Sequence, residues 1–336
     1  MVNASVTTSH EIDWPVGVLP WDRFTLPVIS PNGLHAAVQL GRIPPKNIIV
    51  GHSNKQFDST IISLHPLDPS HGMTMPPLTI EARGLLLSRA ADDIGVFVES
   101  PRAEAGRWIG RINWETGKLS WIVANEAINA FPTVNRNGDI AWSQRDAEDD
   151  RFHLVVQSIN GKQIIDDGES DWLYPMLLGR DRLRAYRLKK GELRLVEFDL
   201  HTATPLLTAI SHLIMEEGAT RHHVWQIATT NPHASGSSQH AFYHPIRRCM
   251  TVWDPSGAVK TAYFLTNSLA AAPTSDGSWI VSLGNRVIRQ EPGKVDGIHI
   301  RNQLAIPFAT TSKQWTHYML IPDGTRMQVR AINLSN

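Results

Sequence analysis

A short turn motif returns along this chain. Each copy has an anchor residue that is usually proline, then a turn that is often Asn-Gly or Asp-Gly, and then an apolar segment. Six copies align, and they begin at Pro27, Leu86, Pro132, Pro175, Pro232 and Pro273. Successive copies are 41 to 59 residues apart, and a four-stranded propeller blade takes roughly 40–50 residues. The sequence therefore predicts an all-β fold, a β-propeller of four-stranded blades.

Turn signals between the copies predict further hairpins. Asn160-Gly161 separates two apolar segments, and Asn-Gly is the strongest short hairpin signal because both turn residues need a positive φ. In the hairpin that begins after Ile112, the pattern predicts that Ile112 faces Trp121. Helical periodicity is scarce, and the best helix candidate is Thr208 to Glu217.

The number of blades follows from two different counts. Six anchors favour six blades, whereas the hairpin turns and the length of the region after Ser282 favour seven, and we prefer seven over six. We predict a single propeller domain over residues 1–336, with the N- and C-terminal segments closing the ring in one blade, because an open propeller would expose sheet edges. Trp14 to Phe24 is the predicted N-terminal strand, paired with the hairpin formed by Tyr318 to Ile332.

Two copies of the motif point to a known repeat. Ser30-Pro31-Asn32-Gly33 and Thr274-Ser275-Asp276-Gly277 fit the turn of the TolB-like, WD-like propeller repeat, and the chain resembles that family over most of its length. The resemblance implies the propeller fold. It implies no activity, because the family includes transport accessory proteins, peptidase propeller domains and polysaccharide lyases. The matching residues are structural in the family, so no functional site is carried over.

Charge and composition restrict the partners that we expect. Thirty-two basic residues balance 32 acidic ones, which argues against nucleic acid or a membrane as the main partner. Cys249 is the only cysteine, so no disulfide is expected within the chain. Met1 to Leu19 lacks the continuous apolar stretch of a secretory signal. We therefore expect a cytoplasmic protein.

Motifs for nucleophilic catalysis or nucleotide binding do not stand out. A serine hydrolase needs Gly-x-Ser-x-Gly on a strand-to-helix turn, and the nearest string, Gly51-His52-Ser53-Asn54-Lys55, lacks the second glycine. A Gly-x-x-x-x-Gly-Lys-(Ser/Thr) phosphate loop is missing from the sequence as well. The sequence therefore leans away from an enzyme without deciding the question.

Histidines are concentrated in one region. Six of the fifteen fall within 33 residues: His212, His222, His223, His233, His240 and His244. Neutral imidazole is the commonest metal ligand, and His240 and His244 would share one face of a strand. A divalent metal held by His233, His240 and His244 is therefore the alternative to a protein without cofactors. The spacing matches no zinc signature, so solvated or hydrogen-bonded loop histidines are the preferred interpretation.

Aromatic and acidic clusters offer two further interpretations. Trp172 and Trp225 precede repeat anchors, and aromatic residues dominate binding hot spots, so these two are the predicted partner-binding residues. Core packing is the competing interpretation for both, since large aromatic residues are highly buried on average. It is the expectation for Trp142, which lies within a predicted strand. The acidic run Asp146 to Asp150 is expected to be a solvated loop.

Two hypotheses about function remain open. The first is a non-catalytic binding or scaffold propeller that presents one face to a protein or peptide partner, since a rigid scaffold with variable loops suits that role. The second is a metal-assisted lyase or hydrolase that acts on a polysaccharide through the histidines from His222 to His244. Convergence of three of these histidines on one point would separate the two.

Overall fold

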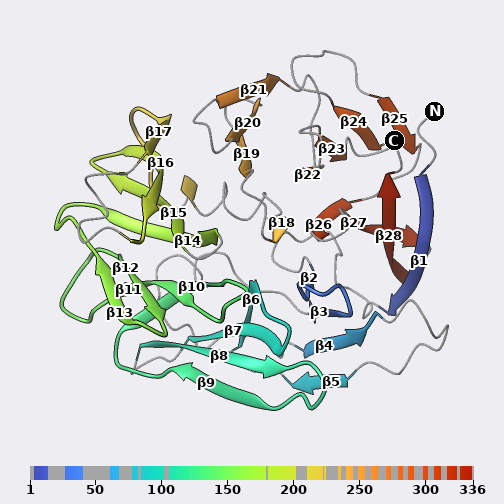
Figure 1. Ribbon diagram of the computed structural model, residues 1–336, viewed down its shortest axis with the longest axis horizontal. Helices are drawn as coiled ribbons and strands as arrows, with labels where there is room; N and C mark the ends of the chain where they lie inside the picture. Colours follow the sequence, from blue (N-terminus) through green and yellow to red (C-terminus); the bar gives the residue numbers. More distant parts are fainter. Residues whose placement is uncertain are drawn as a thin grey trace. The chain divides into compact units, whose positions relative to one another are not determined.

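The computed structural model describes the central part of the chain almost continuously and separate strands elsewhere. The described residues are 4–13, 27–40, 61–67, 78–81, 85–101, 106–178, 181–201, 210–221, 223–224, 234–235, 240–244, 249–253, 259–263, 270–273, 279–282, 287–290, 298–301, 306–311, 316–323 and 326–334. Nearly all regular secondary structure in them is β-strand (Figure 1). This confirms the predicted all-β class.

The described part of the chain holds no helix that is both long enough and apolar enough to span a membrane. The chain divides into two compact units. The first comprises residues 1–35, 66–76 and 226–336, and the second comprises residues 36–65 and 77–225. Each unit is described by itself.

Two antiparallel meanders of the second unit are joined in one eight-stranded sheet. The first consists of β6 (Leu86–Ala91), β7 (Gly95–Pro101), β8 (Arg107–Asn113) and β9 (Leu119–Val123). The second consists of β10 (Ile128–Val134), β11 (Ile140–Arg145), β12 (His153–Ser158) and β13 (Gly161–Ile165). A parallel bridge between Ile128 and Arg107 links them.

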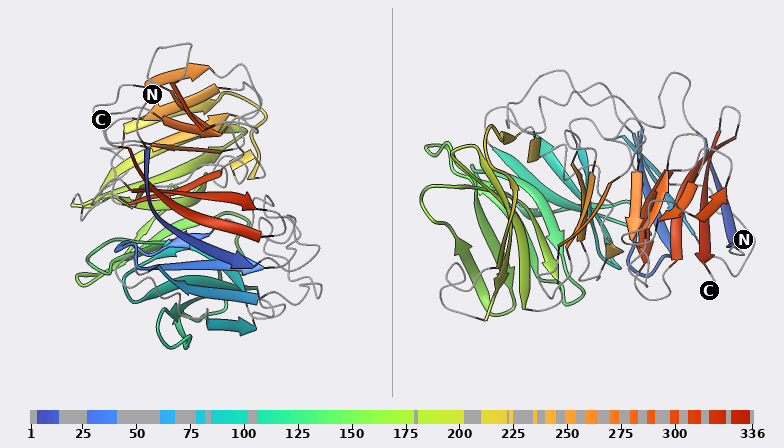
Figure 2. Two further views of the ribbon diagram at one scale, coloured as in Figure 1. Left: turned by 90° about the vertical axis from the view of Figure 1, so that its right-hand side faces the viewer. Right: turned by 90° about the horizontal axis from the view of Figure 1, so that it is seen from above.

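A third meander of the second unit follows directly. It consists of β14 (Asp171–Leu178), β15 (Arg182–Lys189), β16 (Glu192–Asp199) and β17 (Ile210–Met215), in that order in the sheet. Figure 2 shows the strands of these meanders running side by side. Lys190 and Gly191 connect β15 to β16, and both have a positive φ, as a tight hairpin turn between twisted strands requires.

The remaining strands form four smaller sheets. One contains β2 (Val28–Ile29), β3 (His35–Leu40), β4 (Ile61–Pro66) and β5 (Leu78–Glu81). A three-stranded sheet contains β19 (His240–His244), β20 (Cys249–Trp253) and β21 (Val259–Tyr263). Another contains β22 (Ala270–Pro273), β23 (Trp279–Ser282), β24 (Val287–Gln290) and β25 (Ile298–Arg301). The last has the order β1-β28-β27-β26-β18, with β1 (Ala4–Asp13), β18 (Ala234–Ser235), β26 (Ile306–Thr311), β27 (Thr316–Asp323) and β28 (Arg326–Leu334).

Hydrogen bonds explain the recurring turn. After β2, the Ser30 carbonyl accepts a bond from the Gly33 amide at 2.8 Å, and Gly33 has φ 75°. The Asn32 side chain accepts bonds from the Ser30 hydroxyl at 2.6 Å and the Leu34 amide at 2.9 Å. A short polar side chain that bonds to its own turn, followed by glycine at positive φ, is the chemistry of a tight reversal. The motif is therefore a turn signal.

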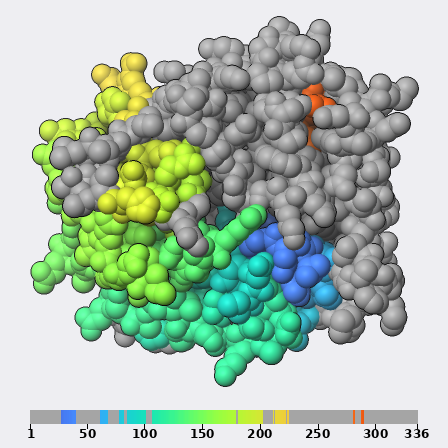
Figure 3. All heavy atoms as spheres, viewed as in Figure 1, coloured from blue at the N-terminus to red at the C-terminus, as the bar shows by residue number. Residues whose placement is uncertain are grey.

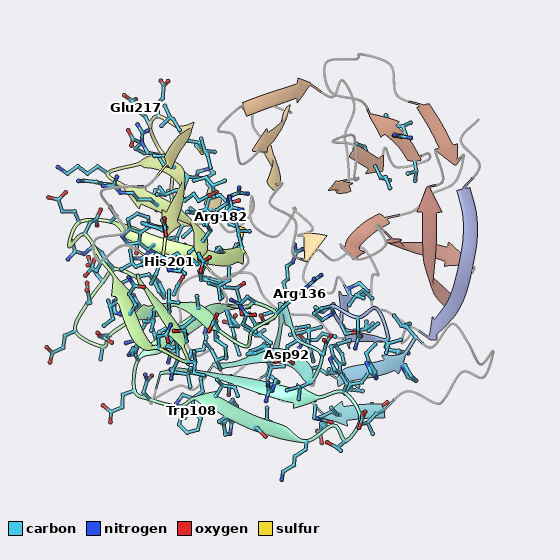
Figure 4. All side chains as sticks on the ribbon, in the orientation of Figure 1. Asp92, Trp108, Arg136, Arg182, His201 and Glu217 are labelled. Carbon is cyan, nitrogen blue, oxygen red and sulfur yellow. The ribbon has the colours of Figure 1, made fainter. Side chains whose placement is uncertain are left out.

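Other side chains can make the same turn. After β10, the Asn135 side chain accepts bonds from the amides of Asn137 at 2.9 Å and Asp139 at 3.0 Å. After β6, the Asp92 carboxylate accepts bonds from the amides of Ile94 at 2.9 Å and Gly95 at 2.7 Å. The copy anchored at Leu86 thus keeps the turn chemistry through an aspartate. Figure 4 labels Asp92 and Arg136, one on each of these turns.

The predicted hairpin at Asn160-Gly161 is confirmed, because Ser158 pairs with Gly161 between β12 and β13. The predicted register of the β8–β9 hairpin is wrong. Ile112 pairs with Leu119, and Trp121 pairs with Gly110. The Asn113 side chain accepts bonds from the amides of Glu115 and Thr116, which lengthens the turn and shifts the register by two residues.

Two predicted elements need further correction. The helix candidate Thr208 to Glu217 contains strand β17, which pairs with β16 from Ile210 to Met215. Pairing with a neighbouring strand overrides a weak helical pattern, because most helix stability comes from tertiary packing. The N-terminal strand that pairs with the C-terminal hairpin is β1 (Ala4–Asp13). Trp14 to Phe24, the segment predicted for this strand, lies outside the described residues.

The core of the second unit is assembled from successive meanders. One buried cluster joins the six strands from β11 to β16: Ala141, Leu154, Val156, Ile165, Trp172, Leu177, Leu183, Ala185, Val196 and Phe198. Another includes Phe97, Ile109, Trp142 and Val155. Trp142 is buried, as expected from the sequence. Ala90 of β6 belongs to the second cluster, and Val134 of β10 packs against it.

Candidate functional site

The first strands of three consecutive meanders each carry an irregularity at a corresponding place. In β6, residues 88–90 lie opposite a single residue of β7. In β10, residues 131 and 132 lie opposite one residue of β11, and in β14, residues 174 and 175 lie opposite one residue of β15. Bulges re-aim side chains and are over-represented next to functional sites. The residues concerned are Arg89, Phe131 and Tyr174, and β10 contacts both β6 and β14.

Two of these residues have an uncommon backbone conformation. Phe131 has φ 57° and Tyr174 has φ 52°, in the left-handed region where a bulky side chain is an outlier. Each precedes a proline, Pro132 or Pro175, and a residue in that position favours extended conformations. Such strain costs about 1–3 kcal/mol per residue and persists only where the surroundings hold it in place.

Two kinds of contact, ring stacking and a hydrogen bond, surround the strained residues Phe131 and Tyr174. The rings of Phe131 and Tyr174 stack, with centroids 3.8 Å apart and planes 19° from parallel. The Phe131 amide donates a hydrogen bond to Glu99 Oε1 at 2.9 Å. Ring stacking and a carboxylate at the backbone therefore hold the bulge of β10 in position.

Glu99 belongs to a buried ion pair. Its Oε2 accepts a bond from Arg107 Nη1 at 3.0 Å, and both side chains are at most 8% exposed. Burial raises the pKa of the Glu99 carboxyl, and the Arg107 guanidinium limits that rise. The Arg107 carbonyl in turn accepts a bond from the Asn129 side chain at 2.8 Å. Both oxygens of Glu99 are engaged, so this carboxylate has a supporting role.

The side chains of Arg89 and Tyr174 supply the polar chemistry. Both are partly exposed at the surface, yet burial lowers the pKa of Arg89 to about 10 and raises the pKa of Tyr174 well above its ordinary value. At neutral pH the guanidinium is therefore charged and the phenol is protonated. Arg89, Glu99, Arg107, Phe131 and Tyr174 are called the bulge cluster below. The cluster offers hydrogen-bond donors and aromatic faces.

The predicted partner-binding residue Trp172 lies in the core of the second unit. Its side chain is fully buried, packs edge-on against Phe198 at 5.2 Å, and lies under the Arg187 guanidinium at 5.6 Å. The core interpretation of Trp172 therefore holds, because its strand β14 turns this residue toward β15 and β16. Trp225, the other predicted partner-binding residue, lies outside the described residues.

The histidines of the metal hypothesis are described only in part. His233 lies outside the described residues, and His240 and His244 are the first and last residues of β19. No group of three metal-ligating side chains occurs in the part of the chain that the structure describes. The metal hypothesis is not tested by these residues.

The acidic run forms an exposed loop between β11 and β12. Asp146, Glu148 and Asp150 are exposed. Asp149 accepts a bond from the Arg151 amide at 3.0 Å, and this bond lowers the pKa of its carboxyl. The predicted solvated loop is confirmed for these residues.

One signal in the sequence marks the bulge cluster. The anchors Pro132 and Pro175 are each preceded by an aromatic residue, 43 residues apart, whereas Pro27 and Pro273 are preceded by Leu26 and Ala272. Aligning the copies on the residue before the proline would have found the stacked pair. Arg89 has no such marker, because its copy lacks the proline.

Comparisons with known proteins give the fold. No protein-family model matches the chain, and no curated protein matches it. The β-propeller domain of Cps50 (Swd1) from Myceliophteria thermophila is similar, with a TM-score of 0.53, 12% identity, and coverage of 98% of this chain and 100% of that one. Virginiamycin B lyase from Staphylococcus aureus has a TM-score of 0.50 and 13% identity over 98% of this chain and 99% of that one.

A peptidase is also similar in structure. Prolyl oligopeptidase B from Galerina marginata has a TM-score of 0.51 and 10% identity, covering 88% of this chain and 46% of that one. At such identities the likeness shows the fold alone. The chain has a β-propeller fold, as the repeat predicted, whereas membership of the TolB-like, WD-like repeat family stays a prediction.

Proposed function

We propose that this chain is a non-catalytic binding propeller of seven blades, and that it presents the bulge cluster to a protein or peptide partner. Seven blades are proposed from the order of the strands: β2–β5, β6–β9, β10–β13, β14–β17, β19–β21, β22–β25, and β26–β28 with β1. The single bridge between β8 and β10 joins two of these meanders without merging them. No cofactor is part of the proposal.

The observation that carries the proposal is the pair of strained aromatic residues. Phe131 and Tyr174 are held in left-handed conformations on neighbouring first strands and stack at 3.8 Å. Backbone strain of this kind is concentrated at active sites and ligand sites. Tyrosine is also among the residues enriched at binding hot spots.

Electrostatics favour binding over proton transfer. A general base near neutral pH needs a pKa close to 7. Burial moves the pKa of Tyr174 away from that value, and Arg89 keeps its proton with a pKa of about 10. Glu99 is occupied by Arg107 and by the Phe131 amide. These groups are suited to hold a ligand through donors and ring faces.

A capture experiment tests this proposal. The full chain is cross-linked in an extract of its native host, and the captured proteins are compared for wild type and Tyr174→Leu. Trp121→Leu is the matched control, because Trp121 is an exposed aromatic residue of β9 and its ring contacts Trp108. We expect a protein that is captured by wild type and Trp121→Leu and lost with Tyr174→Leu. Identical capture by all three chains would contradict the proposal.

A further inference from the structure

A buried hydrogen-bond network supports the bulge of β10. In the space-filling view the described residues of β6 to β16 form one continuous surface (Figure 3), and Asn129, two residues before Phe131, is fully buried. The Asn129 Nδ2 donates to the carbonyl oxygens of Arg107 at 2.8 Å and Ala127 at 3.1 Å. The Asn129 Oδ1 accepts a bond from Trp142 Nε1 at 2.9 Å. One side-chain amide thus ties β10 to the first residue of β8 and to β11.

The backbone beside this amide is packed too closely for a side chain at position 106. Gly106 has φ 81°, and a Cβ atom there would lie 2.3 Å from the Ala127 carbonyl oxygen. The Arg107 amide donates to the same oxygen at 3.1 Å, and Arg107 forms the parallel bridge with Ile128. The network therefore holds Arg107 against β10 at the bridge that joins the first two meanders.

Arg107 connects this network to a strained residue. Its guanidinium bonds to Glu99 Oε2 at 3.0 Å, and Glu99 Oε1 accepts the Phe131 amide at 2.9 Å. Phe131 has two accessible arrangements, because a residue before proline favours an extended backbone and here φ is 57°. The strained arrangement persists only where the surroundings hold it. We therefore expect a displaced Arg107 to release Phe131 and to separate its ring from that of Tyr174.

We propose that Asn129 and Trp142 are positioning residues of the bulge cluster. They act through the Arg107–Glu99 pair and determine how much of the population has Phe131 in the left-handed conformation. This inference rests on the proposed function. Both side chains are at most 2% exposed, so neither contacts the partner itself. Coupling of this kind needs contiguous contacts and an element with two arrangements, and the hydrogen bonds and the strained backbone supply them.

Fluorine NMR of the full chain tests the positioning without a partner. The chain contains five tyrosines, so labelling with 3-fluorotyrosine allows the Tyr174 signal to be assigned as the one lost in Tyr174→Phe. Asn129→Ala should move this signal toward its position in Phe131→Ala, because the two rings no longer stack. Trp142→Phe, which removes the indole N–H and keeps an aromatic ring, should move it in the same direction. Asn113→Ala is the matched control, since the Asn113 side chain accepts bonds within its own turn, and it should leave the signal in place.

The capture experiment of the proposed function then measures the effect on binding. Asn129→Ala should reduce capture of the Tyr174-dependent protein at least about fivefold, the population ratio that corresponds to the lower bound of such strain. Trp142→Phe should reduce it less, because the Asn129 bonds to Arg107 and Ala127 are kept. Melting temperatures show which variants are folded, and Trp142→Phe decides the outcome if Asn129→Ala does not fold.

An unchanged Tyr174 signal in folded Asn129→Ala would overturn the inference, and so would an equal movement in Asn113→Ala or undiminished capture by Asn129→Ala. If capture depends on Tyr174 in any of these cases, the proposed function stands and only the positioning is wrong. If the signal moves and capture is independent of Tyr174, the network holds the bulge and the proposed function is what fails.

Discussion

Strands β10 and β22 occupy the same place in their repeats and differ in their backbones. In β22, every residue from Ala270 to Pro273 pairs with one residue of β23. In β10, a bulge interrupts the pairing with β11, and Phe131 has a positive φ. The copy of the repeat at Pro273 fits the consensus turn better than the copy at Pro132. The copy that fits the consensus turn better, at Pro273, is therefore the one whose first strand has no bulge.

The comparison shows that different residues of the repeat indicate the fold and the candidate site. The turn glycine and its polar neighbour make the hairpin, and any copy that keeps them folds in the same way. The residue before the proline decides what the first strand presents, an alanine in β22 and an aromatic ring in β10 and β14. In β26, Phe308 is also an extra residue in the pairing with β27. We therefore expect functional residues at positions where a copy departs from the consensus of the repeat.

The largest effect is expected from removing the carboxylate that supports the bulge of β10. Glu99→Ala removes the carboxylate that pairs with the buried Arg107 and accepts a hydrogen bond from the Phe131 amide, and breaking a buried pair costs about 3–5 kcal/mol. The melting temperature should fall by at least about 6 °C. The double variant Glu99→Leu/Arg107→Met should recover much of the loss, because no buried charge is left unpaired. A melting temperature of Glu99→Ala close to that of wild type would show that the pair does not hold the bulge.

Glycine substitutions should have opposite signs on the two strands. Phe131→Gly should be more stable than Phe131→Ala by about 1 kcal/mol, because only glycine adopts a positive φ without strain. Ala271→Gly in β22 should instead destabilise the chain by roughly 0.5–1 kcal/mol, since glycine loses more entropy in a regular strand. Chemical denaturation of the three variants and wild type measures both differences. If glycine were more stable than alanine at both positions, or less stable at both, the two strands would not differ in backbone strain.

A smaller effect concerns pH. Burial raises the pKa of Glu99 above its ordinary value of 4.5, so the folded state holds this proton more tightly than the unfolded state does. Its stabilisation is complete below the ordinary pKa and is lost as the pH rises through the raised one. The stability of wild type relative to Glu99→Gln should therefore decrease as the pH rises above 4.5. Thermal unfolding of both chains at several pH values checks the direction, and a difference that grows with pH would contradict it.

No effect at all is expected from removing metal. Protein purified without added metal should carry well under one equivalent of zinc, manganese or calcium, and a chelator should leave its melting temperature unchanged. A stoichiometric metal that is lost on His240→Ala or His244→Ala would place a site on β19, because loss of a bound ligand lowers apparent stability by mass action. That outcome would move the search for function from the bulged strands to the histidines.

The sequence predicted those parts of the fold that depend on local chemistry. Turns made by Asn-Gly or Asp-Gly were found because the residues in the turn also make its hydrogen bonds, as at Asn32 and Asn135. The strands β17 and β1 were not predicted, because each forms through pairing with another strand, β16 or β28, and its own sequence pattern does not show this. The register after Ile112 was wrong because it depends on the side chain of Asn113 in the turn.

The candidate site was missed for a related reason. Arg89, Phe131 and Tyr174 lie on three strands, and their proximity depends on bulges that no single segment reveals. Trp172 was predicted to bind a partner because it is a large aromatic residue before a repeat anchor, yet its side chain is fully buried. Phe131 and Tyr174 stand out only when the copies of the repeat are compared at the residue before the proline.

The pairing of β1 with β28 has a consequence for how the chain is made. Ala4 lies opposite Leu334, so β1 meets its neighbour β28 only after all the residues between them have been synthesised. At about 5–20 residues per second, that wait is roughly 20 to 70 seconds. During this time the strand edge is open to other nascent chains, and a chaperone that shields the first residues would raise the yield of folded protein. Completion of this sheet therefore waits for the synthesis of β28.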